Sequence, residues 1–200
     1  MRRALIAAAV AIAIIVIAII ALTQYRQPEY SRPLVPKSLE DLISGASPSL
    51  EVSSSFRNWS NIPRIYTCDG ADTSPPIEVS NIPASAKCLA LIMYDPDAPR
   101  GTFYHWLLYN ISIRASSIRI PPDMPKEYST PYGLQGVNDF GAVGYGGPCP
   151  PHGSKHRYVI LVLALSECPR LPPGLNAASL INSLRGKVIS YGLIVGTYGR

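Results

Sequence analysis

The chain has 200 residues, a net charge of +5 at pH 7 and 20 prolines. This length suits one domain with an additional segment, and the prolines favour a loop-rich β fold over a helical one. Lysine and arginine are scattered singly, without a basic block or interleaved aromatic residues, which argues against nucleic acid as a partner.

The first 22 residues predict a membrane anchor. Two arginines precede nineteen uninterrupted apolar residues, Ala4 to Leu22, close to the roughly 20 that a helix needs to cross a bilayer. A cleavable signal has a shorter apolar core and a small-residue cleavage site. We therefore expect residues 1–22 to form a single-pass transmembrane helix in the cell membrane, with a cleaved signal and a secreted domain as the alternative.

The flanking charges predict the orientation of this anchor. Arg2, Arg3 and the amino terminus outweigh Arg26, so the N-terminus should stay in the cytosol. The globular domain is then expected on the extracytoplasmic side.

Residues 23–49 are polar and proline-containing, which predicts a linker with a short helical piece at Ser38–Ile43. A single domain is expected over residues 50–200, because about 150 residues can bury one core. Strands are predicted at residues 50–56, 77–79, 89–94, 106–111, 158–165 and 188–198. One helix is expected after Asn176, with Gly186 past its end. This pattern favours an antiparallel β-sandwich or barrel-like fold.

Most of the reactive side chains fall in two short segments, each beside an apolar strand. One segment contains Asp95, in the sequence DPDAP, and His105; the other, Gly144–Tyr158, contains His156. If these strands are neighbours in one sheet, the three side chains meet at one edge. A carboxylate beside imidazoles favours the protonated imidazole, so this edge predicts a site for an anion.

Simpler interpretations apply to several of these residues. Asp97 is expected to be structural, because an aspartate after a strand commonly binds nearby backbone N–H groups. A lone histidine beside aromatic residues, such as His105, is more often a core residue than a catalyst. His152 is expected to face solvent.

Enzymatic and metal-binding alternatives are weaker. His152 and His156 have the spacing of metal ligands, and Cys149 could be a thiol nucleophile, but no Cys-x-x-Cys, Gly-x-Ser-x-Gly or phosphate-binding loop supports them. We predict no metal, no cofactor and no catalytic residue. A hydrolase that uses Asp95 and the histidines is the least favoured alternative.

Four cysteines in an exterior domain favour two disulfides, with three connectivities, over free buried thiols. If the strands pair antiparallel with Asp95 near His156, Cys88 and Cys168 come together at the far end of the sheet. That arrangement leaves Cys68 with Cys149, near the proposed site.

Several motifs together resemble the phosphatidylethanolamine-binding protein (PEBP) family, and its prokaryotic Raf-kinase-inhibitor-like branch in particular. The motifs are YTCDGADTSPPIEV, ALIMYDPDAP, FYHWLLYNI, QGVNDFGAVGYGGPCPPHGSKHRY and LIVGTYGR, and the resemblance covers Leu50–Arg200. It implies a β-sandwich with a central antiparallel sheet, a smaller sheet and a few short helices. It also implies a small pocket that binds anions and phosphorylated head groups.

The resemblance assigns ligand-binding positions residue by residue. Those expected to line the pocket are Asp95, Ala98, Pro99, Phe103, His105, Gly147, Pro151, His156 and Tyr158. Eukaryotic members carry a C-terminal helix over this pocket, whereas this sequence ends after a strand, so a more open mouth is expected.

The resulting functional prediction is a membrane-anchored binding protein, not an enzyme. Its pocket would hold a phosphate-like or carboxylate group of a small molecule or lipid head group. Backbone N–H groups of Gly144–Gly147 and a protonated histidine would attract the anion, so binding should strengthen as pH falls through ~6.5. The alternative is an inhibitor of an exterior serine or other protease that acts through surface loops.

Overall fold

The computed structural model describes residues 30–200, and its compact unit, Arg32–Arg200, contains two β-sheets. The predicted anchor, residues 1–22, lies outside the described residues. Among residues 30–200, no helix has the length and apolarity required to cross a membrane. The domain begins earlier than the sequence predicted, because helix α2 (Lys37–Ile43) belongs to this unit and buries Leu39 and Leu42.

The larger sheet has seven strands in the order β2-β10-β9-β4-β5-β8-β7, and all neighbours are antiparallel except β2 and β10. The smaller sheet has the order β1-β3-β6. The strands are β1 (Glu51–Ser54), β2 (Ser60–Asn61), β3 (Ile77–Ser80), β4 (Cys88–Asp95), β5 (Phe103–Ser112), β6 (Ile118–Ile120), β7 (Ser129–Thr130), β8 (Gly133–Gln135), β9 (Lys155–Leu165) and β10 (Val188–Gly199).

Every strand that the sequence predicted is present, whereas β2, β6, β7 and β8 were not predicted. These four strands have only two or three residues, too few to show an alternating pattern. Helix α3 (Ala177–Leu184) begins as predicted, with the Asn176 side chain accepting the Ser179 N–H at 2.9 Å. A short 3-10 helix, η1 (Arg64–Tyr66), interrupts the loop before β3.

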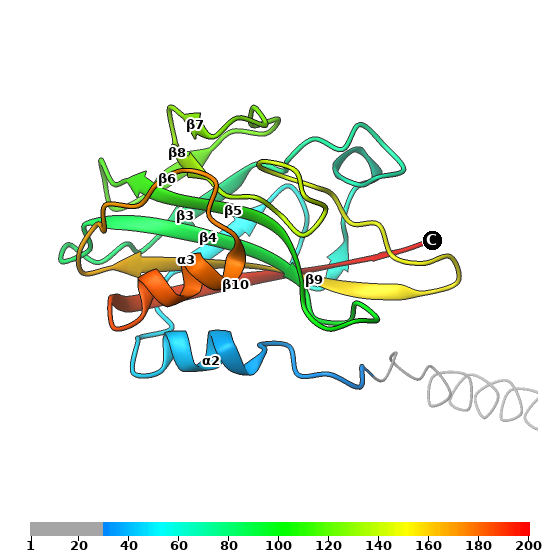
Figure 1. Ribbon diagram of the computed structural model, residues 1–200, viewed down its shortest axis with the longest axis horizontal. Coiled ribbons are helices and arrows are strands. Elements are labelled where there is room, and N and C mark those ends of the chain that lie inside the picture. Colours follow the sequence, from blue (N-terminus) through cyan, green and yellow to red (C-terminus); the bar gives the residue numbers. More distant parts are fainter. Residues whose placement is uncertain (1–29) are drawn as a thin grey trace, which may run out of the picture. The chain divides into compact units, whose positions relative to one another are not determined.

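The central strands are buried on both faces, so the unit has three layers (Figure 1). Along β4, Leu89, Leu91 and Met93 point into the core between the two sheets. Ala90, Ile92 and Tyr94 alternate with them and pack in a second core, which α2 and α3 cover. Because successive side chains point to opposite faces and both faces are buried, Cys88–Tyr94 of β4 and Tyr158–Leu165 of β9 are apolar runs rather than alternating ones.

The four cysteines form the two pairs that the strand order predicted. Cys68 and Cys149, here called the pocket disulfide, have Sγ atoms 2.09 Å apart, and Cys88 and Cys168, the sheet disulfide, join the far ends of β4 and β9. Both pairs have Cα separations, 5.4 and 5.5 Å, that suit a disulfide. The antiparallel register of β4 and β9 therefore determines which cysteines meet.

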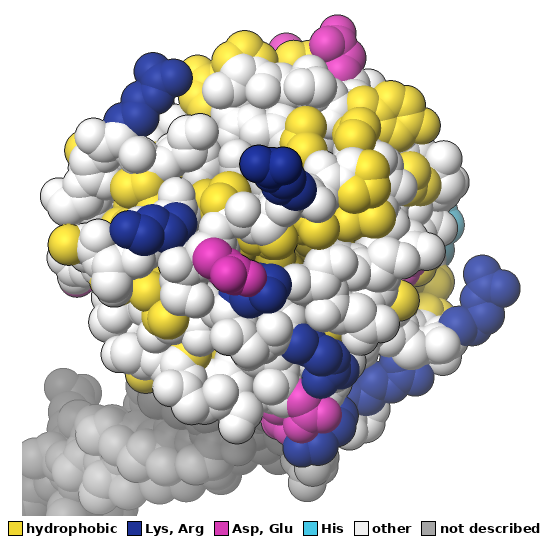
Figure 2. All heavy atoms as spheres, turned by 60° about the vertical axis from the view of Figure 1, so that its left-hand side comes forward, with side chains coloured by type: hydrophobic (Ala, Val, Ile, Leu, Met, Phe, Trp, Pro, Cys, Tyr) yellow, Lys and Arg dark blue, Asp and Glu magenta, His cyan; other side chains and the backbone are white. Residues whose placement is uncertain are grey.

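The end of the domain away from the C-terminus carries dispersed basic side chains (Figure 2). Lysine and arginine side chains on this face are separated by neutral and hydrophobic surface. Two basic side chains of the domain, Arg119 and Lys187, pair with Glu78 and Glu167. This distribution agrees with the scattered positive charge of the sequence.

Candidate functional site

Three strand ends meet at one edge of the larger sheet, as the sequence predicted. Asp95, the last residue of β4, pairs with Phe103, the first residue of β5. On the other side of β4, Tyr94 pairs with Val159 of β9, which places His156 and Tyr158 beside the end of β4. The register therefore brings together side chains that lie more than sixty residues apart in the sequence.

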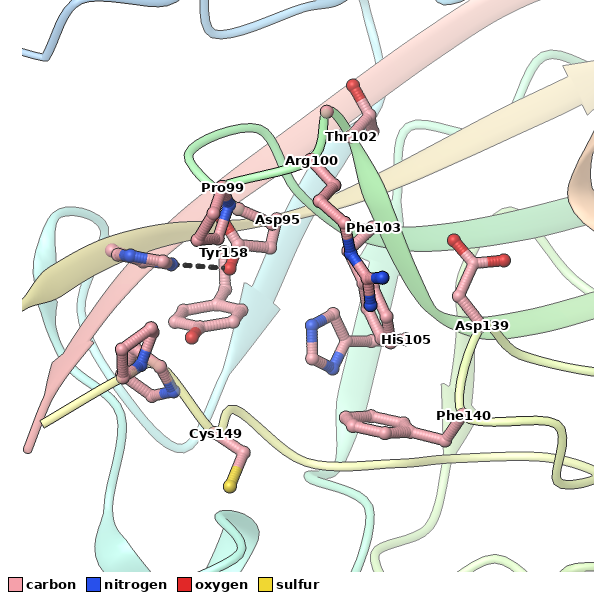
Figure 3. Close-up of a pocket in the computed structure, with 15 residues that line it drawn as sticks. Asp95, Pro99, Arg100, Thr102, Phe103, His105, Asp139, Phe140, Cys149 and Tyr158 are labelled. Atoms are coloured by element: carbon pink, nitrogen blue, oxygen red, sulfur yellow. Dashed lines mark hydrogen bonds and ion pairs between the residues drawn. The ribbon is translucent and has the colours of Figure 1, made fainter.

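These strand ends and two loops enclose a pocket of about 420 Å³ (Figure 3). Eight of the nine predicted ligand-binding residues line it: Asp95, Ala98, Pro99, Phe103, His105, Pro151, His156 and Tyr158. The ninth, Gly147, lines a neighbouring hollow, where its N–H donates to Asp72 Oδ1 at 2.6 Å. A Cβ at this position would lie 2.5 Å from the Tyr66 carbonyl oxygen, so close backbone packing explains the glycine.

Asp95 and His156 form a buried pair at one wall of the pocket. The His156 Nδ1 lies 2.7 Å from Asp95 Oδ2, and the Asp97 N–H donates to Asp95 Oδ1, also at 2.7 Å. Burial raises the pKa of the Asp95 carboxyl, while the hydrogen bond to His156 and the Asp97 N–H act in the opposite direction. The carboxylate therefore orients the imidazole toward the pocket and keeps Nδ1 occupied.

His105 lies between the rings of Tyr158 and Phe140 and makes edge contacts with both (Figure 3). Its Nδ1 is 2.7 Å from the Gly146 carbonyl oxygen, which can only accept, so this nitrogen carries the proton. Burial lowers the pKa of His105 from its ordinary value to about 4, although the backbone of Gly146 and Gly147 opposes the shift. The expectation of a protonated imidazole near pH 6.5 is therefore wrong for His105, because desolvation outweighs its hydrogen bonds.

Tyr158 presents an unsatisfied hydroxyl to this site. The residue lines the pocket and is 1% exposed, and its hydroxyl has no hydrogen-bond partner among residues 30–200. Burial is the main cause that raises the pKa of this phenol, and the nearby Asp95 carboxylate raises it further, so the hydroxyl keeps its proton. A buried hydroxyl that makes no hydrogen bond is costly, so an ordered water or a ligand oxygen is expected to complete it.

The pocket mouth contains residues that the sequence reasoning missed. They are Arg100, Gly101, Thr102, Asp139, Phe140 and Pro150, whereas Cys149, which also lines the pocket, was expected near it as a disulfide partner. Arg100, which is exposed, lies just after the DPDAP motif and therefore outside it, whereas Asp139 and Phe140 lie within the quoted NDFG segment. The Asp139 carboxylate accepts the Tyr104 N–H at 2.8 Å, and Phe140 is 52% exposed at the rim.

The backbone N–H groups of the glycine-rich loop are not arranged as an anion cradle. Gly144 N–H donates to the Gly136 carbonyl, Gly146 N–H to the His105 carbonyl, and Gly147 N–H to Asp72. Because these three donors already have acceptors in the protein, the predicted role of the glycine N–H groups in attracting an anion is wrong. Its glycines serve close packing instead.

A buried ion pair between Asp97 and Arg157 stabilises the turn that follows Asp95. Asp97 accepts Nε of Arg157 at 2.8 Å and Nη2 at 2.5 Å, and it also accepts the Arg157 backbone N–H at 2.9 Å. This agrees with the structural role predicted for Asp97. Arg32 also stabilises this turn, because its guanidinium donates hydrogen bonds to the carbonyls of Ala98 and Pro99. The backbone carbonyl of Arg32 in turn accepts a hydrogen bond from Arg157 Nη2.

The alternative chemistries have less support in this geometry. Cys149 is engaged in the pocket disulfide, so it is not a free thiol nucleophile. His152 is exposed and does not line the pocket. Within the described residues, no group of three or more His, Cys, Asp or Glu side chains is placed to hold a metal ion.

The domain is thus a β-sandwich with a small pocket where three strand ends meet. The family model described as phosphatidylethanolamine-binding protein matches residues 52–199, and the chain belongs to this family. Its relatives include UPF0098 proteins of Aquifex aeolicus, 45% identical over 80% of this chain and 94% of the relative, and of Pyrococcus horikoshii (PH1269), 44% identical over 76% and 77%.

Two crystal structures resemble this fold. One is a putative PEBP homologue from Chlamydia trachomatis, with a TM-score of 0.68 and 32% identity, which matches 77% of this chain and 99% of that chain. The other is YbcL of Escherichia coli, described as a member of the mammalian PEBP family, with a TM-score of 0.69 and 29% identity over 76% and 99% of the two chains. The mainly β fold with few helices is thereby confirmed.

Proposed function

We propose that this domain binds a phosphate-like or carboxylate group, of a small molecule or lipid head group, in the pocket at the end of β4. The observation that carries the proposal is the buried Tyr158 hydroxyl, which makes no hydrogen bond to the described residues, although the Asp95 carboxylate lies near enough to act on it. An anionic oxygen placed in the pocket would accept this hydrogen bond.

The surroundings of Tyr158 support an anion as the missing partner. Arg100 brings a guanidinium to the mouth, and His156, oriented by Asp95, lines the wall opposite His105. The aromatic rings around His105 make this wall of the pocket apolar, and a hydrogen bond made in less polar surroundings is electrostatically stronger. The proposal is one of binding, and it includes no turnover of the ligand.

The test is a calorimetric titration of the full chain with O-phosphoethanolamine, with ethanolamine alone as the ligand control. In Tyr158→Phe, only the unsatisfied hydroxyl is removed. Because a hydrogen bond to a charged group contributes about 1.5–3 kcal/mol, affinity should fall roughly tenfold to a hundredfold. The same change should leave the stability of the ligand-free protein unchanged or raise it, since it removes an unpaired buried donor.

Tyr145→Phe is the matched control. Tyr145 is equally buried, but its hydroxyl donates to the Tyr66 carbonyl at 2.5 Å and it lies outside the pocket. This variant should lose stability and retain affinity. If Tyr158→Phe instead binds as tightly as the wild type, the proposal fails, and inhibition of a protease through surface loops becomes the function to test.

We also infer an extracytoplasmic location with attachment to the cell membrane through residues 1–22. Two disulfides within one small domain support this inference, because disulfides persist mainly in oxidising compartments. Mass spectrometry of the native protein after alkylation without reduction tests it. Four alkylated thiols would contradict an oxidising environment, whereas none would support it.

A further inference from the structure

Two polar groups of the pocket, the His105 ring and the Tyr158 hydroxyl, differ in whether they accept or donate a hydrogen bond. This difference indicates which protonation state of a ligand the pocket would favour. His105 Nδ1 is held as a donor by the Gly146 carbonyl, so the neutral ring offers a lone pair at Nε2. The hydrogen bond of the ring to the Gly146 carbonyl is made by Nδ1, the Gly147 backbone also acts on the ring, and the ring lines the pocket. The Tyr158 hydroxyl beside it offers a donor. The centroids of the two rings are 5.2 Å apart, so both residues lie on the same part of the pocket wall.

We propose that the pocket selects a phosphate group in its singly protonated, monoanionic form, with the P–O–H donating to His105 Nε2 and an unprotonated oxygen accepting from Tyr158. This inference rests on the proposed function and deepens it. A dianion has no proton to donate, so it would place an anionic oxygen against the lone pair of a neutral imidazole.

The charges around the pocket favour the same protonation state. Asp95 faces the site from β4 and Asp139 from the loop after β8, and Arg100 is the guanidinium at the mouth. His156 on β9 is bonded to Asp95, and Asp72 acts on His105 from the neighbouring hollow. With carboxylates on both sides, a second negative charge on the ligand adds like-charge repulsion. The lowered pKa of His105, about 4, keeps this ring neutral at the pH values of the test.

The experiment compares three ligands with the wild-type full chain between pH 5 and 8. O-Phosphoethanolamine has a second phosphate pKa of about 6. 2-Aminoethylphosphonate has a higher second pKa and can donate the same proton at higher pH. O-Sulfoethanolamine has a similar shape and a single negative charge, but it carries no proton to donate.

The affinity of each phosphorus ligand should fall about tenfold per pH unit above that ligand's own pKa. The midpoint of the profile should therefore move to higher pH for the phosphonate. The sulfate ester should bind roughly tenfold or more weakly than the phosphate ester at pH 5, because one hydrogen bond to a charged group is missing. The ³¹P chemical shift of the bound phosphate ester should stay at its monoanion value at pH 7.

Other outcomes separate this inference from the proposed function. A common midpoint for both phosphorus ligands would place the titrating group on the protein and overturn the inference alone. Tighter binding of the sulfate ester, or a dianion shift in the bound ³¹P spectrum, would do the same. Absence of binding by all three ligands would overturn the proposed function itself.

Discussion

Replacing Asp97 by alanine should destabilise the domain strongly, because it leaves the Arg157 guanidinium buried without its carboxylate. The Asp97 and Arg157 side chains are 11% and 6% exposed. The carboxylate accepts two side-chain donors and one backbone donor of Arg157, and the substitution removes all three acceptor contacts. The Arg32 carbonyl remains as an acceptor for Arg157 Nη2.

The magnitude follows from this burial. Breaking a buried ion pair by removing one partner costs about 3–5 kcal/mol, far more than loss of an exposed pair. For a domain of this size, each kcal/mol lowers the melting temperature by roughly 2–4 °C, so a decrease on the order of 10 °C is expected for Asp97→Ala. Asp97→Asn keeps the shape and one acceptor oxygen, and it should cost less.

Urea denaturation with the disulfides intact, followed by fluorescence of the buried Trp106, measures these free energies of unfolding. The double variant Asp97→Ala/Arg157→Met removes the isolated charge and should recover a large part of the loss. A cost below about 1 kcal/mol for Asp97→Ala, or simple addition of the two single costs in the double variant, would refute this account of the ion pair.

Removing either disulfide should cost about 2–5 kcal/mol of stability, but only loss of the pocket disulfide should also weaken ligand binding, because Cys149 lines the pocket. Calorimetry of the two double-alanine variants would show this contrast, and equal affinities would contradict it. Arg32→Ala should weaken binding by up to about tenfold, because it removes the two hydrogen bonds from Arg32 to the turn, each of which contributes about 1 kcal/mol. Titration with O-phosphoethanolamine measures this loss of affinity. Between pH 6.5, the ordinary pKa of histidine, and about pH 4, the pKa of folded His105, this residue binds fewer protons in the folded than in the unfolded state. The free energy of unfolding should therefore fall by ~3 kcal/mol as the pH is lowered through this range. The raised pKa of Asp95 has the opposite effect above pH 3.8, because it increases the stability as the pH falls. The His105→Phe variant is therefore the comparison, and its free energy of unfolding should fall less over the same pH range. Equal pH dependence of stability in the two proteins would exclude His105 as the cause.

The strand ends could be predicted from the sequence because the relevant pattern is local. The apolar runs before Asp95 and after His156 predict strands, and their antiparallel pairing predicts both the pocket edge and the cysteine pairs. The family motifs then supplied the pocket residues. Short strands such as β7 and β8 left no pattern and were missed.

The chemistry of individual groups was harder to predict, because it depends on contacts made across the fold. The tautomer and charge of His105 are set by its burial and by the Gly146 carbonyl, forty-one residues away in the sequence. Likewise, Gly147 fits the glycine-rich pattern of an anion cradle, but its N–H is taken by Asp72. Composition cannot reveal which donors are already satisfied.

The contact between Arg32 and the DPDAP turn has a consequence for proteolytic processing. The family model match begins at residue 52, yet one wall of the pocket is held by a residue twenty positions upstream. A peptidase that released the domain by cutting before Arg32 would leave this contact intact, whereas trimming back to the family boundary would remove both Arg32 and helix α2. The position of such a cut would thus decide whether the domain keeps or loses the hydrogen bonds of Arg32 to this wall of the pocket.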